Sequence, residues 1–128
     1  MPLSLIGPAA FAQATGGGQT KPATPNDLNI YIGMGTSFLC DAIARDIEFP
    51  KAAGMAVGTP LAAFNALNGG ELKGISKKMP EEKAIQMFKT EIFLKATQTC
   101  PEGLPKEIKD RAEEIKKVLL ERNKKMKK

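Results

Sequence analysis

The sequence predicts an all-α fold, a small four-helix domain with one long-range disulfide. After the leader, apolar residues recur every three or four positions in four segments, which is typical of helices that face a core. Runs of strand type are scarce. The only two cysteines, Cys40 and Cys100, lie far apart and near predicted helix ends. Because about 100 residues follow the leader, we expect a single domain.

The first helix is predicted to begin at Thr36 or Ser37, since both are good N-cap residues. The preceding apolar run, 28–34, is interpreted as either a strand or a lead-in to this helix. Pro50 is expected to end the helix. Its apolar stripe consists of Leu39, Ile43 and Ile47.

The second helical segment covers residues 51–70 and is expected to break near Gly58. Thr59 followed by Pro60 has the form of a new N-cap with proline in the first turn. The run Asn68-Gly69-Gly70 predicts a stop. A short polar connector, 71–79, follows, with room for one extended pair.

The third helix is predicted to open at Pro80 and to stop at Cys100, and the fourth to begin at Pro105. The third is expected to be central because its apolar face is the widest, with a stripe of Ile85, Phe88, Ile92 and Ala96. The stripe of the fourth, which also requires a core beside it, is Ile108, Ala112, Ile115 and Leu119.

The beginning of the chain predicts export. The apolar run 3–11 is followed by small-x-small sites ending at Ala12 and Ala14, as signal peptidase requires. No basic residue precedes the run, so we interpret 1–14 as a residual signal peptide whose start lies upstream. The alternative is an Ala-rich end of a cytosolic protein. We expect a disordered linker at 15–27, the helical domain at 28–124, and a periplasmic or secreted location.

In an oxidising compartment, an even cysteine count predicts a disulfide between Cys40 and Cys100. Closing a loop of about 60 residues would contribute about 4 kcal/mol on the chain-entropy model. The bond would tie the first helix to the junction of the last two. Two buried free thiols are the alternative.

The net charge of +5 is concentrated at the C-terminal end. Residues 1–104 carry nine Lys or Arg and nine Asp or Glu, whereas 105–128 carry ten and five. The basic tail, 125–128, is therefore interpreted as a solvated end or as a weak contact for anionic surfaces. The residues available for that contact are Arg122, Lys124, Lys125, Lys127 and Lys128.

The absence of His excludes Ser-His-Asp and Cys-His catalysis and most zinc sites. We expect no cofactor and no metal. Gly33-x-Gly35 before a helix resembles a dinucleotide-binding turn, but Phe38 stands where its third glycine belongs. We therefore expect these glycines only to let the chain turn into the first helix.

Two other groups of residues have a functional and a plainer interpretation. One group could carry out acid–base chemistry and consists of Asp41, Arg45, Asp46 and Glu48. We prefer to interpret it as a solvated helix face with an Asp41–Arg45 ion pair. The methionines and phenylalanines could line a ligand groove, but we prefer the interpretation that they fill the core. The methionines concerned are Met34, Met55, Met79 and Met87.

Residues 31–120 resemble small exported helical proteins of cyanobacteria, on the segments GTSFLCDAIARD, LNGGELKGI, KKMPEEKA and QTCPEGLPKEIKDRAEE. Some of these proteins carry the label class II cyclic-AMP phosphodiesterase, which implies a metal bound by His and Asp. This chain has no His, so that activity does not carry over. The arrangement of the chain is also similar to that of HdeA-type periplasmic chaperones, in which one disulfide precedes a Lys-rich last helix. In this sequence the corresponding elements are Cys40, Cys100 and residues 105–125.

We therefore expect an exported, non-catalytic helical protein that binds a protein partner or protects other proteins. A small hydrolase of the phosphodiesterase type is the alternative. We expect no specific nucleic-acid partner. We also expect no transmembrane segment, because no apolar run of about 20 residues follows the leader.

Overall fold

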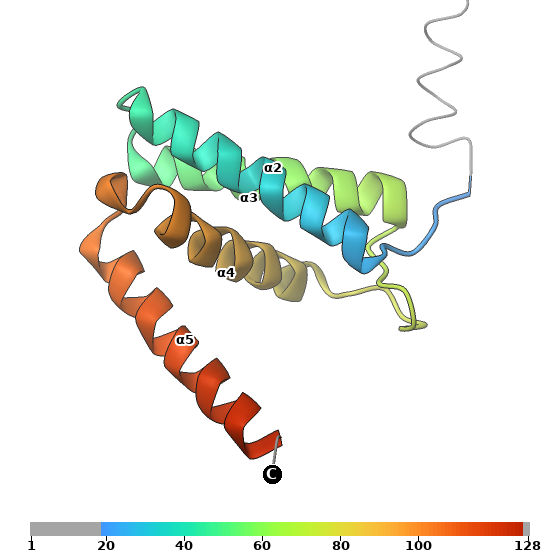
Figure 1. Ribbon diagram of the computed structural model, residues 1–128. Helices are drawn as coiled ribbons and strands as arrows, with labels where there is room; N and C mark the ends of the chain where they lie inside the picture. The colour runs from blue at the N-terminus through green and yellow to red at the C-terminus, as the bar shows by residue number, and fades with distance from the viewer. Residues whose placement is uncertain (1–18, 127–128) are drawn as a thin grey trace, which may run out of the picture.

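A computed structural model describes residues 19–126, which contain four α-helices and no strand (Figure 1). The helices are α2 (Pro25–Ala44), α3 (Phe49–Asn68), α4 (Glu81–Thr99) and α5 (Lys106–Met126), with a 3-10 turn, η1 (Pro101–Gly103), before the last. The predicted all-α, four-helix class is confirmed. The predicted signal peptide, residues 15–18 of the predicted linker, and Lys127 and Lys128 lie outside the described residues.

Helix α2 begins well before the predicted start at Thr36 or Ser37, which was wrong. Thr24 is the N-cap: its hydroxyl accepts from the Asp27 amide at 3.1 Å, and the Asp27 carboxylate accepts from the Thr24 amide at 3.0 Å. This reciprocal capping box satisfies amides that the helix leaves free. Thr36 lies inside α2, and its hydroxyl donates to the Ile32 carbonyl at 2.8 Å. The expected boundary at residues 27 and 28 thus falls within the first turn of α2.

The segment before α2 joins the body through backbone hydrogen bonds. Ala23 is buried and forms an isolated parallel bridge with Leu72 in the connector after α3. Its amide donates to the Glu71 carbonyl at 2.8 Å, and its carbonyl accepts from the Lys73 amide at 2.9 Å. The one extended pair expected in the connector is therefore formed with the segment that precedes α2.

The ends of α2 and α3 differ from the prediction in two places. Helix α2 ends at Ala44, and Pro50 lies in the first turn of α3, where proline is well tolerated. The break expected near Gly58 is absent: α3 runs unbroken through Pro60, which is fully buried. The burial of this ring in the core offsets the hydrogen bond that proline cannot donate. The stop after Asn68 is confirmed, with Gly69 in the left-handed region at φ 61°.

The core lies where α2, α3 and α4 meet. Its largest fully buried side chains are Phe64, Phe88, Leu39, Ile92 and Pro60. The ring of Phe88 meets those of Phe64 and Tyr31 edge-on, with centroids 5.6 and 6.4 Å apart. The prediction that the third helix is central is confirmed, because α4 packs against each of the other three helices.

One buried polar pair closes the core at the N-terminal end of α2. The Tyr31 hydroxyl donates to Asn68 Oδ1 at 2.7 Å, and Asn68 Nδ2 donates to the Lys21 carbonyl at 2.9 Å. Burial raises the pKa of Tyr31, and the nearby charge of Asp27 raises it further. The phenol is therefore neutral at pH 7 and acts as a donor to Asn68.

The disulfide joins Cys40 to Cys100, with their Cα atoms 5.8 Å apart, and confirms the predicted pairing. Cys40 lies in the second half of α2 rather than in the first turn of a helix. Cys100 is the C-cap of α4. The bond therefore ties α2 to the point at which the chain leaves the three-helix core for α5.

Gly33 and Gly35 both lie inside α2 and do not form a turn into it, so that expectation was wrong. A Cβ on Gly35 would lie 2.7 Å from the Ala56 carbonyl oxygen of α3 and would also meet the Ile92 side chain of α4. A Cβ on Gly33 would meet nothing within 4 Å. Gly35 is therefore a point at which α3 and α4 both approach the backbone of α2 closely.

We expect opposite effects from alanine at these two positions. Gly35→Ala should lower the free energy of unfolding by about 1–2 kcal/mol, since overpacking exceeds the gain in helix propensity. Gly33→Ala should raise it by up to about 1 kcal/mol. Urea denaturation of both variants is the measurement. Equal effects of the two substitutions would contradict the close packing at Gly35.

Candidate functional site

Helix α5 leaves the three-helix body. After Cys100 the chain turns through η1, and buried Leu104 anchors the turn. In Figure 1, α5 (orange to red) runs back beside α4 and then diverges, so that its C-terminal end stands away from the core. Its packing on the body is mainly against α4. The sequence predicted that the whole apolar stripe of α5 would pack against a core, but only part of the stripe does so.

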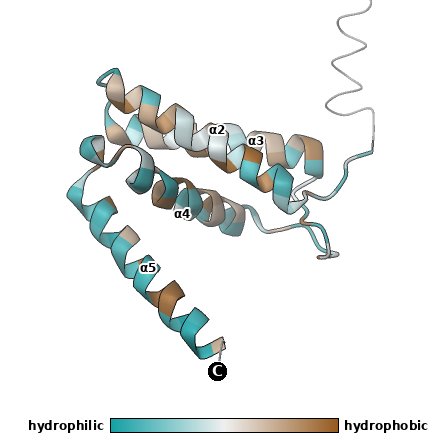
Figure 2. Ribbon diagram, viewed as in Figure 1, coloured by the Kyte–Doolittle hydropathy of each residue, from teal (hydrophilic) through white to brown (hydrophobic). Residues whose placement is uncertain are grey.

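The predicted apolar stripe of α5 changes from buried to exposed along the helix. Ala112 is 3% exposed, and Ile108 and Ile115 are half-buried. Further along the same face, Leu119 is 44% and Met126 is 78% exposed, with Val118 beside them at 55%. We call Val118, Leu119 and Met126 the distal stripe. Figure 2 shows an apolar patch in this half of an otherwise hydrophilic helix.

Positive charge surrounds the distal stripe. Between residues 115 and 126, Glu121 is the only acid, against five bases: Lys116, Lys117, Arg122, Lys124 and Lys125. Of the residues predicted to contact anionic surfaces, Arg122, Lys124 and Lys125 are exposed in the last turns of α5. Cations near the C-terminal end of a helix also interact favourably with the helix dipole. The basic tail expected at residue 125 thus begins inside the helix.

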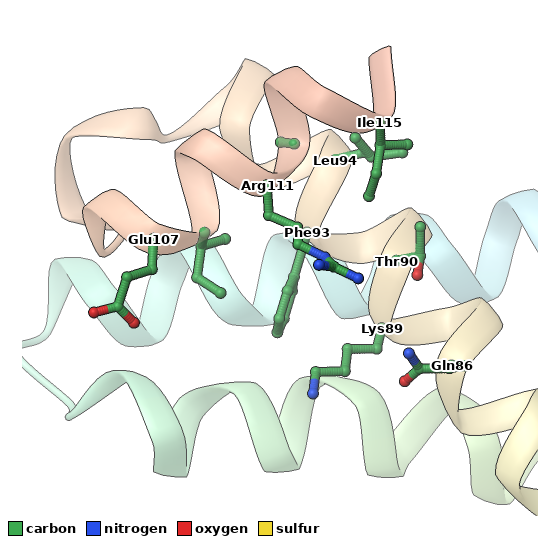
Figure 3. A pocket seen from close by; sticks show the side chains of 10 residues that line it. Gln86, Lys89, Thr90, Phe93, Leu94, Glu107, Arg111 and Ile115 are labelled. Carbon is green, nitrogen blue, oxygen red and sulfur yellow. The ribbon is translucent and has the colours of Figure 1, made fainter. Parts of the chain in front are cut away.

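A cleft of about 360 Å³ lies between α4 and α5, where the two helices begin to diverge (Figure 3). Its apolar lining comes from both helices: Phe93, Leu94, Ile108, Ala112 and Ile115. Its polar lining is Gln86, Lys89, Thr90, Glu107 and Arg111. We call this the α4–α5 cleft.

Two cations of the cleft have no carboxylate partner in the described part of the chain. The ion pairs found there join Arg45 to Asp41, Lys106 to Asp110, and Lys116 to Glu113. Lys89 of α4 and Arg111 of α5 take part in none of them. Figure 3 shows the Arg111 guanidinium directed across the cleft toward Thr90, with Lys89 on the adjoining turn of α4. The cleft therefore combines an apolar lining with two cations contributed by different helices.

The residues considered for catalysis lie elsewhere. Arg45 Nε is 3.1 Å from Asp41 Oδ2 in an exposed pair, as preferred from the sequence, and Asp46 and Glu48 are exposed at the α2–α3 turn. None of the four lines the cleft. Among the described residues, no group of three or more His, Cys, Asp or Glu is placed to hold a metal ion. Glu107 is the single carboxylate in the lining of the cleft.

The methionines considered for a ligand groove also lie outside the cleft. Met79 and Met87 pack against the core, whereas Met34 and Met55 are about half exposed on α2 and α3. The aromatic residue of the cleft is Phe93, which also packs against Phe49 with ring centroids 5.5 Å apart. The preference for core filling thus holds for two of the four methionines.

Sequence reasoning missed Lys89 and Arg111. Each stands four residues before a cleft-lining apolar residue, Lys89 before Phe93 and Arg111 before Ile115. Residues four apart share a helix face, so this spacing on two consecutive helices is a signal that could have found the pair. What the spacing could not show is that the two helices diverge and leave a cavity between these faces.

Comparisons with curated proteins and with solved structures found no match. A comparison with protein families matches residues 26–127 to the family described as Domain of unknown function (DUF8650). The matched region includes almost all of α2 and the whole of α3, α4 and α5. It therefore contains the disulfide, the cleft and the distal stripe. The chain belongs to this family.

Proposed function

We propose that the chain is an exported, non-catalytic binding protein that holds a protein partner on the distal stripe of α5. The observation that carries the proposal is the continuity of the α5 stripe. Its first half packs on α4, and its second half, with the same spacing, stays exposed among five cations. An amphipathic helix with an unpacked face is a recurrent element of protein recognition.

The charge around the stripe selects the partner. Residues 115–126 contain five bases and one acid. We therefore expect the partner to present an acidic surface around an apolar groove. Opposite charges accelerate encounter and exclude basic partners. An unfolded acidic chain with exposed apolar side chains meets the same description, which supports a protective, chaperone-like form of this binding.

Export is part of the proposal. It is supported by the small-x-small sites of the leader together with the Cys40–Cys100 disulfide, since disulfides persist in oxidising compartments. Within residues 19–126, no helix combines the length and apolar character needed to cross a membrane. An intact mass of protein from its host would give the cleavage point.

Serine at Leu119 tests the binding surface, and serine at Leu120 is its matched control. Leu120 is 60% exposed but lies roughly 120° around the helix from Met126, on the side opposite to Val118, and so is off the stripe. The probe is a fluorescent amphipathic peptide of Leu and Glu. Leu119→Ser should weaken its binding about tenfold, the value of one buried leucine side chain. Fluorescence anisotropy measures both variants.

A second peptide, with Lys in place of Glu, checks the charge argument and should not bind. Equal binding of the two peptides, or equal loss with Leu120→Ser, would contradict the proposal. Anionic phospholipid vesicles form the third arm. If the chain binds them but not the Glu peptide, the distal stripe is a membrane contact and the protein-partner proposal is wrong.

A further inference from the structure

We propose that the α4–α5 cleft is a separate binding site for a small amphipathic anion, an alkyl chain that ends in a carboxylate. This site lies beside the first half of α5, whereas the proposed partner surface lies on the second half. The inference stands on the cleft's volume, its two-sided apolar lining and its two cations, and it does not require the partner.

The lining suits an alkyl chain. At about 360 Å³, the cleft falls in the size range of small-molecule sites, and half of its lining residues are apolar. They come from both helices, so a chain lying between α4 and α5 would contact apolar side chains on two sides. Ala112, the smallest of them, is buried where α5 packs on the body. Filling this space would remove apolar surface from water.

The cations suit a carboxylate head group. Lys89 and Arg111 reach the cleft from opposite helices and have no ion-pair partner in the described residues. A carboxylate between them would accept charge-assisted hydrogen bonds from both, and arginine can bind it with two parallel donors. Glu107 is the only opposing charge in the lining. A cationic head group would meet two like charges against that single acid.

The first test compares head groups on the same alkyl chain. Isothermal titration calorimetry of the full chain, below the micelle concentration, uses dodecanoate and dodecyltrimethylammonium. We expect saturable, one-to-one binding of dodecanoate and at least about tenfold weaker binding of the cation. Butanoate, which keeps the head group but lacks the long tail, should not bind measurably. Equal affinity for the two long-chain probes, or no saturation with dodecanoate, would overturn the proposal.

The second test removes the cations. The double variant Lys89→Gln/Arg111→Gln should weaken dodecanoate binding about tenfold or more. Its matched control is Lys95→Gln/Lys109→Gln, which removes the same charge from the same two helices but outside the cleft. If both double variants bound dodecanoate equally weakly, the weakening would come from the change in net charge, and the assignment of the head group to Lys89 and Arg111 would be wrong. Because Lys89 and Arg111 are exposed, the Lys89→Gln/Arg111→Gln variant should keep the thermal midpoint of the parent chain.

The Leu119→Ser variant separates this inference from the proposed function. It should lose the acidic peptide yet bind dodecanoate like the parent chain. Loss of dodecanoate binding in Leu119→Ser would place the ligand on the distal stripe and overturn the cleft assignment. Normal dodecanoate binding by a chain that binds no peptide would leave the cleft site standing and reject only the partner surface.

Discussion

Replacing both Cys40 and Cys100 with alanine is expected to lower the free energy of unfolding by about 4 kcal/mol. The disulfide closes a loop with a sequence separation of 60, which contains the whole of α3 and α4 as well as the connector between them. Without the bond, the unfolded chain regains the conformational freedom that this closure removes. For a domain of this size, the loss corresponds to a fall in the thermal midpoint of roughly 15–30 °C. Thermal unfolding followed by circular dichroism measures it.

Reductant supplies the control for this prediction. It should lower the midpoint of the parent chain by a comparable amount and leave that of the double variant unchanged. Because small domains have total stabilities of about 5–15 kcal/mol, a loss of this size would remove between about a quarter and about four fifths of the total. A midpoint that falls by less than about 5 °C in both experiments would show that the helices hold together without the covalent link.

The Phe88→Ala substitution is expected to lower the free energy of unfolding by about 3–5 kcal/mol. Phe88 is fully buried on α4, and its ring contacts Phe64 of α3 and Tyr31 of α2 edge-on. Truncation leaves a cavity at the point where the three core helices meet, and the aromatic contacts are lost with it. Urea denaturation of the disulfide-bonded chain measures the change as a lower midpoint with an unchanged slope.

Phe38→Ala is the matched control on the surface of α2. Its side chain is 37% exposed, so we expect a loss of less than about 1 kcal/mol. If the two phenylalanine variants lost similar stability, the assignment of the core to the meeting of α2, α3 and α4 would be wrong. A normal loss in Phe88→Ala with a reduced slope would instead indicate a residual change in the unfolded state.

Local rules located the ends of several helices correctly. Gly69 in the left-handed region stops α3, and Pro80 immediately precedes α4, because the conformational limits of these residue types act within one turn. The pairing of Cys40 with Cys100 was also accessible, since two cysteines allow one disulfide. The same rules misplaced the start of α2. Thr24 and Thr36 are both of an N-cap residue type, but only Thr24 is followed three residues later by a carboxylate, Asp27, that returns the hydrogen bond.

The unbroken course of α3 through Pro60 shows why local rules are insufficient. A proline inside a helix costs a hydrogen bond wherever it occurs, but the benefit of burying its ring depends on the neighbouring helices. The same is true of Gly35, which as a residue type predicts flexibility and in the structure marks a close approach between α2 and α3. Both outcomes follow from long-range contacts that no window of sequence contains.

The amino-acid sequence alone predicted the helical class and the Cys40–Cys100 pairing, and it established the cationic end and the lack of histidine chemistry. These properties depend on residue type and on spacing within a few turns. The cleft and the exposed half of the α5 stripe depend instead on the angle at which α5 leaves α4. That angle is set by the turn through η1, which buried Leu104 anchors, and by packing against the core. A periodic stripe shows which face of a helix is apolar, but whether that face is covered is decided by the position of its neighbours.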